Sequence, residues 1–301
     1  MNTVNKFECH VCIKDDNSSI LPQLNQACSL SNADIKQAIA KGALWLTRSG
    51  STQRIRRIKK PLKNNDELHF YYNSEVLSQR AEQAILIADF NDYSVWYKPY
   101  GMLSQGSKWS DHCTINRVVQ LSLKPERPVF IVHRLDRAAS GLMLLAHSKH
   151  AARALSLMFE QHQLEKHYQI IVHGNHQLRP QPDIIELAID NKSAKSIMNT
   201  IEYQADADIS LVDVKIESGR KHQIRKHAAS INLPVVGDRL HGSKQYTYPD
   251  NLNLQLCSVS LRFNCPISGE ERSFQCDPSL SPNIANIALS LIQLRQTSSN
   301  N

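Results

Sequence analysis

An aspartate flanked by two arginines lies at the centre of the stretch Val132-His133-Arg134-Leu135-Asp136-Arg137-Ala138-Ala139-Ser140-Gly141. The apolar run at residues 142–145 follows directly and predicts a buried strand. Ser140-Gly141 predicts a turn ahead of that strand. Neighbouring guanidinium groups favour an ionised carboxylate, so Asp136 is a candidate nucleophile or base. Taken alone, such an aspartate is more often one half of a structural ion pair.

A helix and a strand are predicted directly after this stretch. Ser148 is a suitable N-cap. One buried face at helical spacing is formed by Ala151, Leu155, Met158 and Phe159. The chain then returns in a predicted strand at residues 166–172, where Tyr168 by pattern alone is a half-buried aromatic side chain.

A second basic segment, Gly219-Arg220-Lys221-His222-Gln223-Ile224-Arg225-Lys226-His227, lies further along the chain. On a helix, His222 and Arg225 share a face, whereas Arg220 and Lys226 point elsewhere. One basic group, Arg225, can therefore reach into a site. The spacing disfavours a metal site, because His222 and His227 are five residues apart and no carboxylate completes the set.

Composition restricts the class of protein. The 301 residues are 41% apolar and 21% charged, with a net charge of +7 that suggests a polyanionic partner. No apolar run approaches the roughly 20 residues of a membrane span, and the first twelve residues show no secretory pattern. Seven cysteines at irregular spacing indicate reduced thiols, and Cys9-x-x-Cys12 has no second pair to complete a zinc site. We therefore expect a cytoplasmic protein that contacts no membrane.

The two basic segments together resemble the signatures of the RluA-type family of pseudouridine synthases. The first resembles the loop H-R-L-D-x-x-T-S-G, with Ala139 in place of threonine, and the second resembles G-R-x-H-Q-I-R-x-H. The resemblance covers about residues 85–285. It implies an α+β pseudouridine synthase fold with a mixed, largely antiparallel sheet. It also implies an isomerase that converts uridine in RNA to pseudouridine with no cofactor and no metal.

The same resemblance implies roles for individual residues. Asp136 is implied as the catalytic carboxylate, Tyr168 as the ring that packs on a flipped uracil, and Arg225 as the partner of Asp136. The residues implied in RNA binding and base flipping are Arg134, which fills the vacated space, His133 and Arg220. The predicted strand at residues 254–263 contributes Leu256 to the uracil pocket.

A small module is predicted near the N-terminus. A helix capped at Ser31 ends at Lys41-Gly42, and strands follow at residues 43–47 and 68–72. This order resembles the alpha-L RNA-binding domain, first seen in ribosomal protein S-four. Residues 41–63 hold eight lysines or arginines and no acidic residue. In this context we expect phosphate contacts rather than a merely solvated surface, and the candidates are Lys41, Arg48, Arg54, Arg56 and Arg57.

Three parts of the chain are expected. Residues 1–78 form an alpha-L-type domain with an N-terminal extension, 79–292 a catalytic domain, and 293–301 a disordered tail. The polar stretch at residues 74–83 is a predicted linker that few buried contacts should cross.

The predicted substrate is structured RNA, and the alpha-L module favours large-subunit ribosomal RNA over transfer RNA. We expect a monomer. Two other classes of function stay open: a non-catalytic RNA-binding protein of ribosome assembly on an inactive synthase scaffold, and a base hydrolase or nuclease that uses Asp136. The first would bind RNA without isomerising it, whereas the second would release uracil or cut the strand.

Overall fold

The computed structural model describes residues 5–246, 248–249 and 251–299. Contacts divide the chain into two compact units, one of Met1–Glu82 with Gln105–Leu123 and one of Gln83–Ser104 with Lys124–Asn301. The predicted division into functional domains follows chain order and stays a prediction. The chain also returns to the first unit at residues 105–123, a second crossing that lies outside the predicted linker. Over the described residues no helix has both the length and the apolarity needed to cross a membrane.

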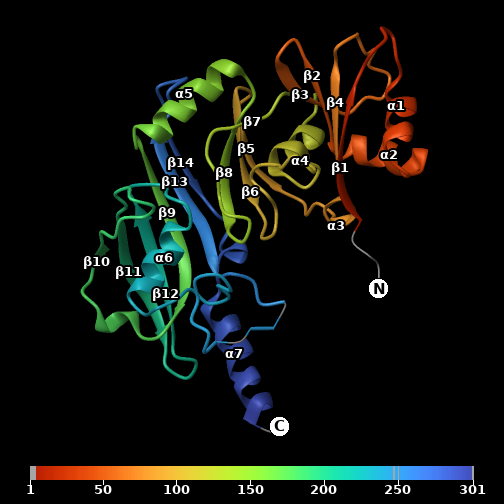
Figure 1. The fold of residues 1–301 in the computed structure, drawn as a ribbon. Coiled ribbons are helices and arrows are strands. Elements are labelled where there is room, and N and C mark those ends of the chain that lie inside the picture. The colour runs from red at the N-terminus through yellow and green to blue at the C-terminus, as the bar shows by residue number, and fades with distance from the viewer. Residues whose placement is uncertain (1–4, 247, 250, 300–301) are drawn as a thin grey trace. The chain divides into compact units, whose positions relative to one another are not determined.

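The first unit is a four-stranded antiparallel sheet whose first two helices lie together on one face (Figure 1). The strand order is β1-β4-β2-β3. Its strands are β1 (Lys6–Cys12), β2 (Leu44–Arg48), β3 (Ser51–Ile55) and β4 (Glu67–Asn73). Its helices are α1 (Ile20–Ala27), α2 (Asn32–Ala40), α3 (Ser74–Ser78) and α4 (Ile115–Ser122). The core lies between the sheet and the first two helices, where Leu24, Ile35 and Phe70 are fully buried.

The predicted helix and its ends are confirmed. Ser31 accepts a hydrogen bond from the Asp34 amide at 3.2 Å, and Ile35 and Ile39 face the core. Gly42 follows the helix at φ +89°, and a Cβ at this position would lie 2.4 Å from Asp111 Oδ1. Glycine is therefore needed both for the backbone conformation and for the approach of residues 105–123.

An additional strand precedes the predicted module. No element is predicted before residue 31, yet β1 pairs with β4 from Lys6↔Asn73 to Cys12↔Glu67. Alternate side chains of β1 pack toward the helices, among them Phe7 and Val11. The N-terminal extension is thus an edge strand of the sheet.

The second unit is built on one large mixed sheet. The described residues form ten strands in the order β10-β11-β12-β9-β13-β8-β6-β5, with β14 on β13 and β7 on β8. The strands are β5 (Ile85–Asp89), β6 (Tyr93–Lys98), β7 (Phe130–Ile131), β8 (Ser140–Ala146), β9 (Leu164–His173), β10 (Asp183–Ile185), β11 (Ser196–Gln204), β12 (Ile209–Ile216), β13 (Leu256–Asn264) and β14 (Glu271–Gln275). Of the pairings in this described sheet, only that of β13 with β8 is parallel. The predicted fold class, an α+β fold with a largely antiparallel sheet, is confirmed.

Helices and short 3-10 turns surround this sheet. They are α5 (Lys149–Glu160), α6 (Gln223–Ser230), α7 (Ile284–Ser299), η1 (His176–Leu178) and η2 (Pro278–Leu280). The N-cap predicted for α5 is confirmed, since Ser148 Oγ accepts from the Ala151 amide at 3.0 Å. Helix α5 packs on β7 and β8, and α6 packs on β11.

The turn predicted at Ser140-Gly141 lies instead at residues 137–138, and these two residues already belong to β8, where it meets β13. Gly141 has φ +116°, and a Cβ there would lie 2.3 Å from the Ser258 carbonyl oxygen of β13. Only glycine therefore allows β8 to start beside β13. This close pairing places residues 132–139 at the end of the central strands.

The C-terminal segment is more ordered than expected. Ile284, Ala288 and Leu291 of α7 are buried against the core around Ile209. Because this helical spacing anchors the segment, residues predicted to be a disordered tail from 293 onward are helical as far as Ser299. Residues 300–301 lie outside the described residues.

Candidate active site

The loop that carries Asp136 is fixed on both sides by side chains of the second unit. The Leu135 amide donates to Ser104 Oγ at 3.1 Å, and Ser104 Oγ donates to the Leu135 carbonyl at 2.6 Å. Lys98 Nζ donates to the Ala139 carbonyl at 2.6 Å. The aspartate therefore projects from a loop with a defined backbone.

Lys98 is a fully buried lysine at the end of β6. Besides Ala139, its ammonium donates to the carbonyls of Met102 at 2.9 Å and Pro99 at 3.1 Å. Burial lowers the pKa of Lys98 to about 7, against an opposing effect of the negative charge of Asp136. Sequence reasoning did not assign Lys98. The available signal was a lysine that ends an otherwise apolar strand directly before Pro99.

The carboxylate of Asp136 faces Arg225, as expected from the resemblance. Arg225 Nη1 lies 3.5 Å from Asp136 Oδ2, and the Arg225 side chain is only 6% exposed. The same guanidinium donates to both oxygens of Asp238, at 2.7 and 2.6 Å. Burial opposes the charged form of Asp238, but its hydrogen bonds from Arg225 and two backbone amides outweigh burial and lower its pKa.

The arginines next to Asp136 in sequence do not pair with it. Arg137 Nε donates to the Gly101 carbonyl at 3.3 Å, and Arg134 is exposed. Within the described part of the chain, the basic groups at ion-pair distance are Arg225 and His222, the latter at 3.9 Å. The positive charge beside Asp136, expected from the arginines near it in sequence, thus comes from Arg225 on α6, which is far away in sequence.

His222 adds a second link between α6 and the loop that follows it. It caps α6 in a left-handed conformation at φ 56°, and its Nδ1 lies 2.8 Å from His241 Nε2. Burial lowers the pKa of both imidazoles, which favours their neutral forms at neutral pH. One ring therefore donates this hydrogen bond and the other accepts it.

Tyr168 and Leu256 line one small cavity together with Asp136, Arg134 and Arg225. Its volume is about 70 Å³. Tyr168 is buried on β9, and burial is the main cause that raises the pKa of its phenol. The ring therefore stays protonated at neutral pH and can donate a hydrogen bond or offer its face for stacking.

His133 has a packing role in this structure. Its Nε2 accepts a hydrogen bond from the Leu144 amide at 2.9 Å, and its ring stacks on Phe159 with centroids 4.2 Å apart. Burial lowers the pKa of His133 to about 3, so the ring is neutral. These contacts explain the residue without RNA, whereas its predicted role in base flipping stays a prediction.

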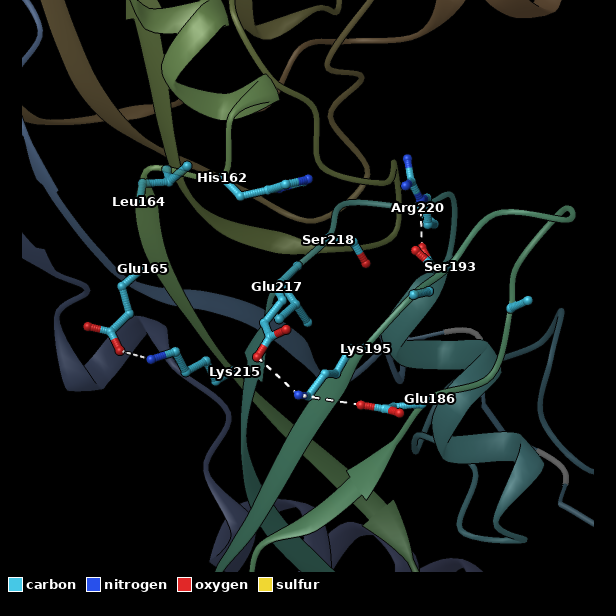
Figure 2. Close-up of a pocket in the computed structure, with 13 residues that line it drawn as sticks. His162, Leu164, Glu165, Glu186, Ser193, Lys195, Lys215, Glu217, Ser218 and Arg220 are labelled. Atoms are coloured by element: carbon cyan, nitrogen blue, oxygen red, sulfur yellow. Dashed lines mark hydrogen bonds and ion pairs between the residues drawn. The ribbon is translucent and has the colours of Figure 1, made fainter.

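A larger pocket of about 950 Å³ has Arg220 in its lining (Figure 2). It shares Arg220 and Ile216 with the small cavity. Its walls carry ion pairs, with Lys195 3.4 Å from both Glu186 and Glu217. Arg220 Nε donates to the Ser193 carbonyl at 3.1 Å, which holds this arginine at the shared wall. Arg220 thus lines both cavities, and its predicted role in RNA binding stays a prediction.

Most candidates in the basic stretch have partners inside the first unit. Arg48 makes two hydrogen bonds to Asp66, at 2.8 and 2.6 Å. Arg54 and Arg56 both pair with Asp111. Lys41 donates to the Leu77 carbonyl.

The remaining candidate, Arg57, is exposed, as are Lys59 and Lys63. None of these three has a side-chain ion pair among the described residues. Phosphate contacts in the basic stretch are therefore better sought at Arg57, Lys59 and Lys63 than at the four paired side chains.

The cysteines and histidines do not gather into a ligand set in the part of the chain that the structure describes. There, no group of three His, Cys, Asp or Glu side chains is arranged to hold a metal ion. Cys9 and Cys12 have free thiols.

The sequence is similar to those of known RNA pseudouridine synthases. A model of the RNA pseudouridylate synthase family matches residues 92–230. The tRNA pseudouridine synthase C of Yersinia pestis is 34% identical over 169 residues, which are 47% of this chain and 66% of that protein. The protein of the same name from Vibrio parahaemolyticus is 32% identical over 58% of this chain and 82% of its own length. An uncharacterized RNA pseudouridine synthase of Aquifex aeolicus is 27% identical over 82% of this chain and 85% of its own.

Solved structures share the fold. Human RNA pseudouridylate synthase domain containing 1 superposes with a TM-score of 0.57 at 21% identity, over 71% of this chain and 96% of that one. Human RNA pseudouridylate synthase domain containing 4 superposes with a TM-score of 0.53 at 19% identity, over 69% of this chain and 93% of that one. With the signature loop, the cavity and the Vibrio relative, these findings lead to one conclusion. The chain belongs to the RNA pseudouridine synthase family, whose members are isomerases.

Proposed function

We propose that this protein converts uridine in RNA to pseudouridine, with Asp136 as the catalytic carboxylate. The observation that carries the proposal is the convergence of Asp136, Tyr168 and Arg225 on one cavity of the second unit. The three residues come from a loop, a strand and a helix that are far apart in sequence. Such convergence is typical of a reaction centre rather than of a single structural ion pair.

The proposed reaction is an isomerisation that neither adds nor removes atoms. The bond from N1 of uracil to C1′ of ribose breaks, a bond from C5 to C1′ forms, and the hydrogen on C5 leaves as a proton while N1 gains one. Asp136 attacks covalently at the sugar or at the base, or it assists formation of a glycal-like intermediate. In each route Arg225 orients the carboxylate and supplies positive charge beside it.

The cavity also suggests how the target base is held. A uracil within folded RNA must leave its stack at a cost of a few kcal/mol. Tyr168 offers a buried ring for stacking, and Leu256 closes the pocket beside it. In this proposal the exposed Arg134 occupies the space that the base leaves.

We propose transfer RNA as the substrate class. The predicted preference for large-subunit ribosomal RNA depends on the alpha-L module, which the family match at residues 92–230 does not reach. The relatives from Yersinia pestis and Vibrio parahaemolyticus are both named for transfer RNA, which favours the alternative. The chain spans 66% of the first of these relatives and 46% of the one from Pectobacterium carotovorum, so the substrate belongs to the proposal.

The first unit is proposed to be an RNA-binding module of the alpha-L type. Its order of a helix, the Lys41-Gly42 turn and short strands supports this assignment. Because Lys41, Arg48, Arg54 and Arg56 are paired internally, these four residues hold the module together in the proposal. Phosphate contacts come from the exposed end of the basic stretch.

The experiment is incubation of the purified protein with unmodified transfer RNA and with large-subunit ribosomal RNA, followed by mapping of pseudouridine at single-nucleotide resolution. New pseudouridine in transfer RNA supports the proposal. Modification confined to ribosomal RNA would overturn the substrate class and keep the reaction. RNA binding without conversion would instead indicate an inactive scaffold, and release of free uracil would indicate a base hydrolase.

A further inference from the structure

The sheet of the first unit has a second face, opposite α1 and α2, with an unusual composition. Because side chains alternate along a strand, the residues between the core positions point to this outer face. On paired positions of the four strands these residues are Lys6, Glu8, His10, Cys12, Trp45, Thr47, Thr52, Arg54, Glu67, His69, Tyr71 and Asn73. This described set contains aromatic, imidazole and basic side chains but no leucine, isoleucine, valine or methionine.

Residues 105–123 add a tryptophan and a lysine to this face. The Trp109 and Tyr71 rings lie edge to face with centroids 5.9 Å apart. Lys108 Nζ lies 4.9 Å from the Tyr71 centroid and 5.1 Å from that of Trp109. Lys6 Nζ lies 5.0 Å from the Trp109 centroid. We refer to Lys6, Tyr71, Lys108 and Trp109 as the Trp109 cluster.

Several contacts keep the cluster in place while leaving it accessible. Trp45 Nε1 donates to the Lys108 carbonyl at 3.0 Å, which fixes the backbone of the loop. Lys6 and Lys108 are exposed, and the two rings of the cluster are half-buried. An exposed lysine over a ring can move aside, so the ring faces are open to a flat ligand.

We propose that the Trp109 cluster binds an unpaired segment of the RNA substrate, with bases stacked on Trp109 and Tyr71 and phosphates held by Lys6 and Lys108. The proposal rests on the proposed function in taking RNA as the ligand. Aromatic rings interleaved with cations are the usual means of binding single strands without sequence preference. A duplex would not fit this role, because its bases are stacked on each other and show no free face.

Composition also argues against a protein partner on this face. The cores of protein interfaces are depleted in lysine and glutamate, whereas Lys6, Lys108 and Glu8 gather around these rings. Glu8 is the one carboxylate that touches the cluster among the described residues, through an ion pair with Lys108 at 2.5 Å. The negative charge of Glu8 should repel an RNA phosphate at Lys108. Removal of this charge should therefore tighten RNA binding.

The test is fluorescence anisotropy of the full-length protein with a labelled, unstructured RNA of about ten nucleotides, a length within the range of known single-strand sites. Trp109→Ala should weaken binding about tenfold without changing the salt slope, since stacking releases no counterions. Trp109→Phe, which keeps a ring, should bind almost as well as wild type. Glu8→Gln should bind more tightly.

The lysines supply a second, independent readout. Lys6→Ala combined with Lys108→Ala should reduce the slope of log affinity against log salt by about 1.4, from two lost phosphate contacts on a single strand. The control is Lys36→Ala. Lys36 is an exposed lysine on α2, on the other face of the sheet, so its replacement should change neither the affinity nor the salt slope. Circular dichroism verifies that each variant is folded.

Unchanged affinity in folded Trp109→Ala would overturn the proposal, and so would an equal loss in Lys36→Ala. The Asp136→Asn variant separates this proposal from the proposed reaction. Loss of conversion in Asp136→Asn, whose RNA affinity should stay nearly unchanged, tests the reaction alone. Weaker binding of the labelled RNA by Trp109→Ala, with or without conversion by the wild type, tests the cluster alone.

Discussion

Asp238 accepts two hydrogen bonds from Arg225, from Nε at 2.7 Å and from Nη2 at 2.6 Å, and this leaves Nη1 directed at Asp136 3.5 Å away. Asp238 is itself held by the amides of Leu240 and His241, both at 2.9 Å. The orientation of Arg225 at the Asp136 carboxylate therefore depends on an aspartate that does not line the cavity.

We expect Asp238→Asn to lower single-turnover conversion about a hundredfold, as misplacement of a reacting group by about 1 Å does. RNA affinity should change little. Removing one partner of a buried ion pair should also lower the free energy of unfolding by about 3 kcal/mol, measured by urea denaturation. The control is Asp190→Asn, because Asp190 is 66% exposed and pairs only at the surface with Lys226. Full activity in a folded Asp238→Asn would contradict the positioning role.

Asp136→Asn should abolish isomerisation and leave folding and RNA affinity nearly unchanged. The amide keeps the shape of the carboxylate but cannot act as a nucleophile or base. Release of tritium from RNA labelled at C5 of uridine measures the reaction directly, since that hydrogen leaves as the new bond forms. The exposed Asp206→Asn is the control and should match wild type. Activity within about tenfold of wild type, a barrier change of only about 1.4 kcal/mol, would rule out Asp136 as the catalytic residue.

Lys98 predicts a pH dependence of stability. An unfolded lysine holds its proton up to about pH 10.4, whereas burial lowers the pKa of folded Lys98 to about 7. Between these values the unfolded state binds more protons, so this group makes stability rise with pH. Urea midpoints at pH 7 and pH 9 should show the rise in wild type and a smaller one in Lys98→Met. Lys98→Met should also be less stable at both values, because three buried carbonyls lose their donor, at about 1–3 kcal/mol.

The exposed end of the basic stretch predicts a change in salt dependence. Replacing Arg57, Lys59 and Lys63 together with alanine should weaken binding to transfer RNA and reduce the salt slope by up to about 2.7. The fold should be unaffected, because these side chains have no ion pair in the described structure. A charge-matched control replaces the exposed Lys36, Lys149 and Lys192. Equal slopes for the two triple variants would mean that the stretch is only a solvated surface.

The signature loop and the helix of Arg225 could be predicted because their chemistry is contained in short contiguous motifs. Sequence also places Tyr168 and Leu256 on strands that prove to be neighbours, β9 and β13. Asp238 follows one of these motifs, but its pairing with Arg225 depends on a loop that folds back over the helix. The position of Lys98 at the end of an apolar strand marks it in the sequence, but its three acceptors are backbone carbonyls, which the sequence does not reveal.

For the basic stretch at residues 41–63, the sequence overestimates the free positive charge. Eight cations with no acid among them suggest free charge, yet their acidic partners lie elsewhere in the chain. Arg48 pairs with Asp66 just beyond the stretch, and Arg54 and Arg56 pair with Asp111. Charge counted within a window cannot include partners that only the tertiary fold brings close.

Removal of residues 1–82 should therefore damage the remaining chain rather than leave an intact catalytic fragment. Asp111 would lose both arginines, and the Ser110 hydroxyl would lose the Lys41 carbonyl to which it donates at 2.9 Å. Trp109 would lose Tyr71 and Lys6 and become an exposed aromatic side chain. We expect the fragment to bind the dye ANS, to aggregate at concentrations where the full chain is soluble, and to melt less cooperatively.

The matched control is full-length Asp111→Ala, which removes only the ion pairs. It should lower the melting temperature without exposing the aromatic cluster, so it should not bind ANS. A fragment that is soluble, melts cooperatively and converts RNA in a single turnover at the wild-type rate would show that residues 105–123 do not need residues 1–82.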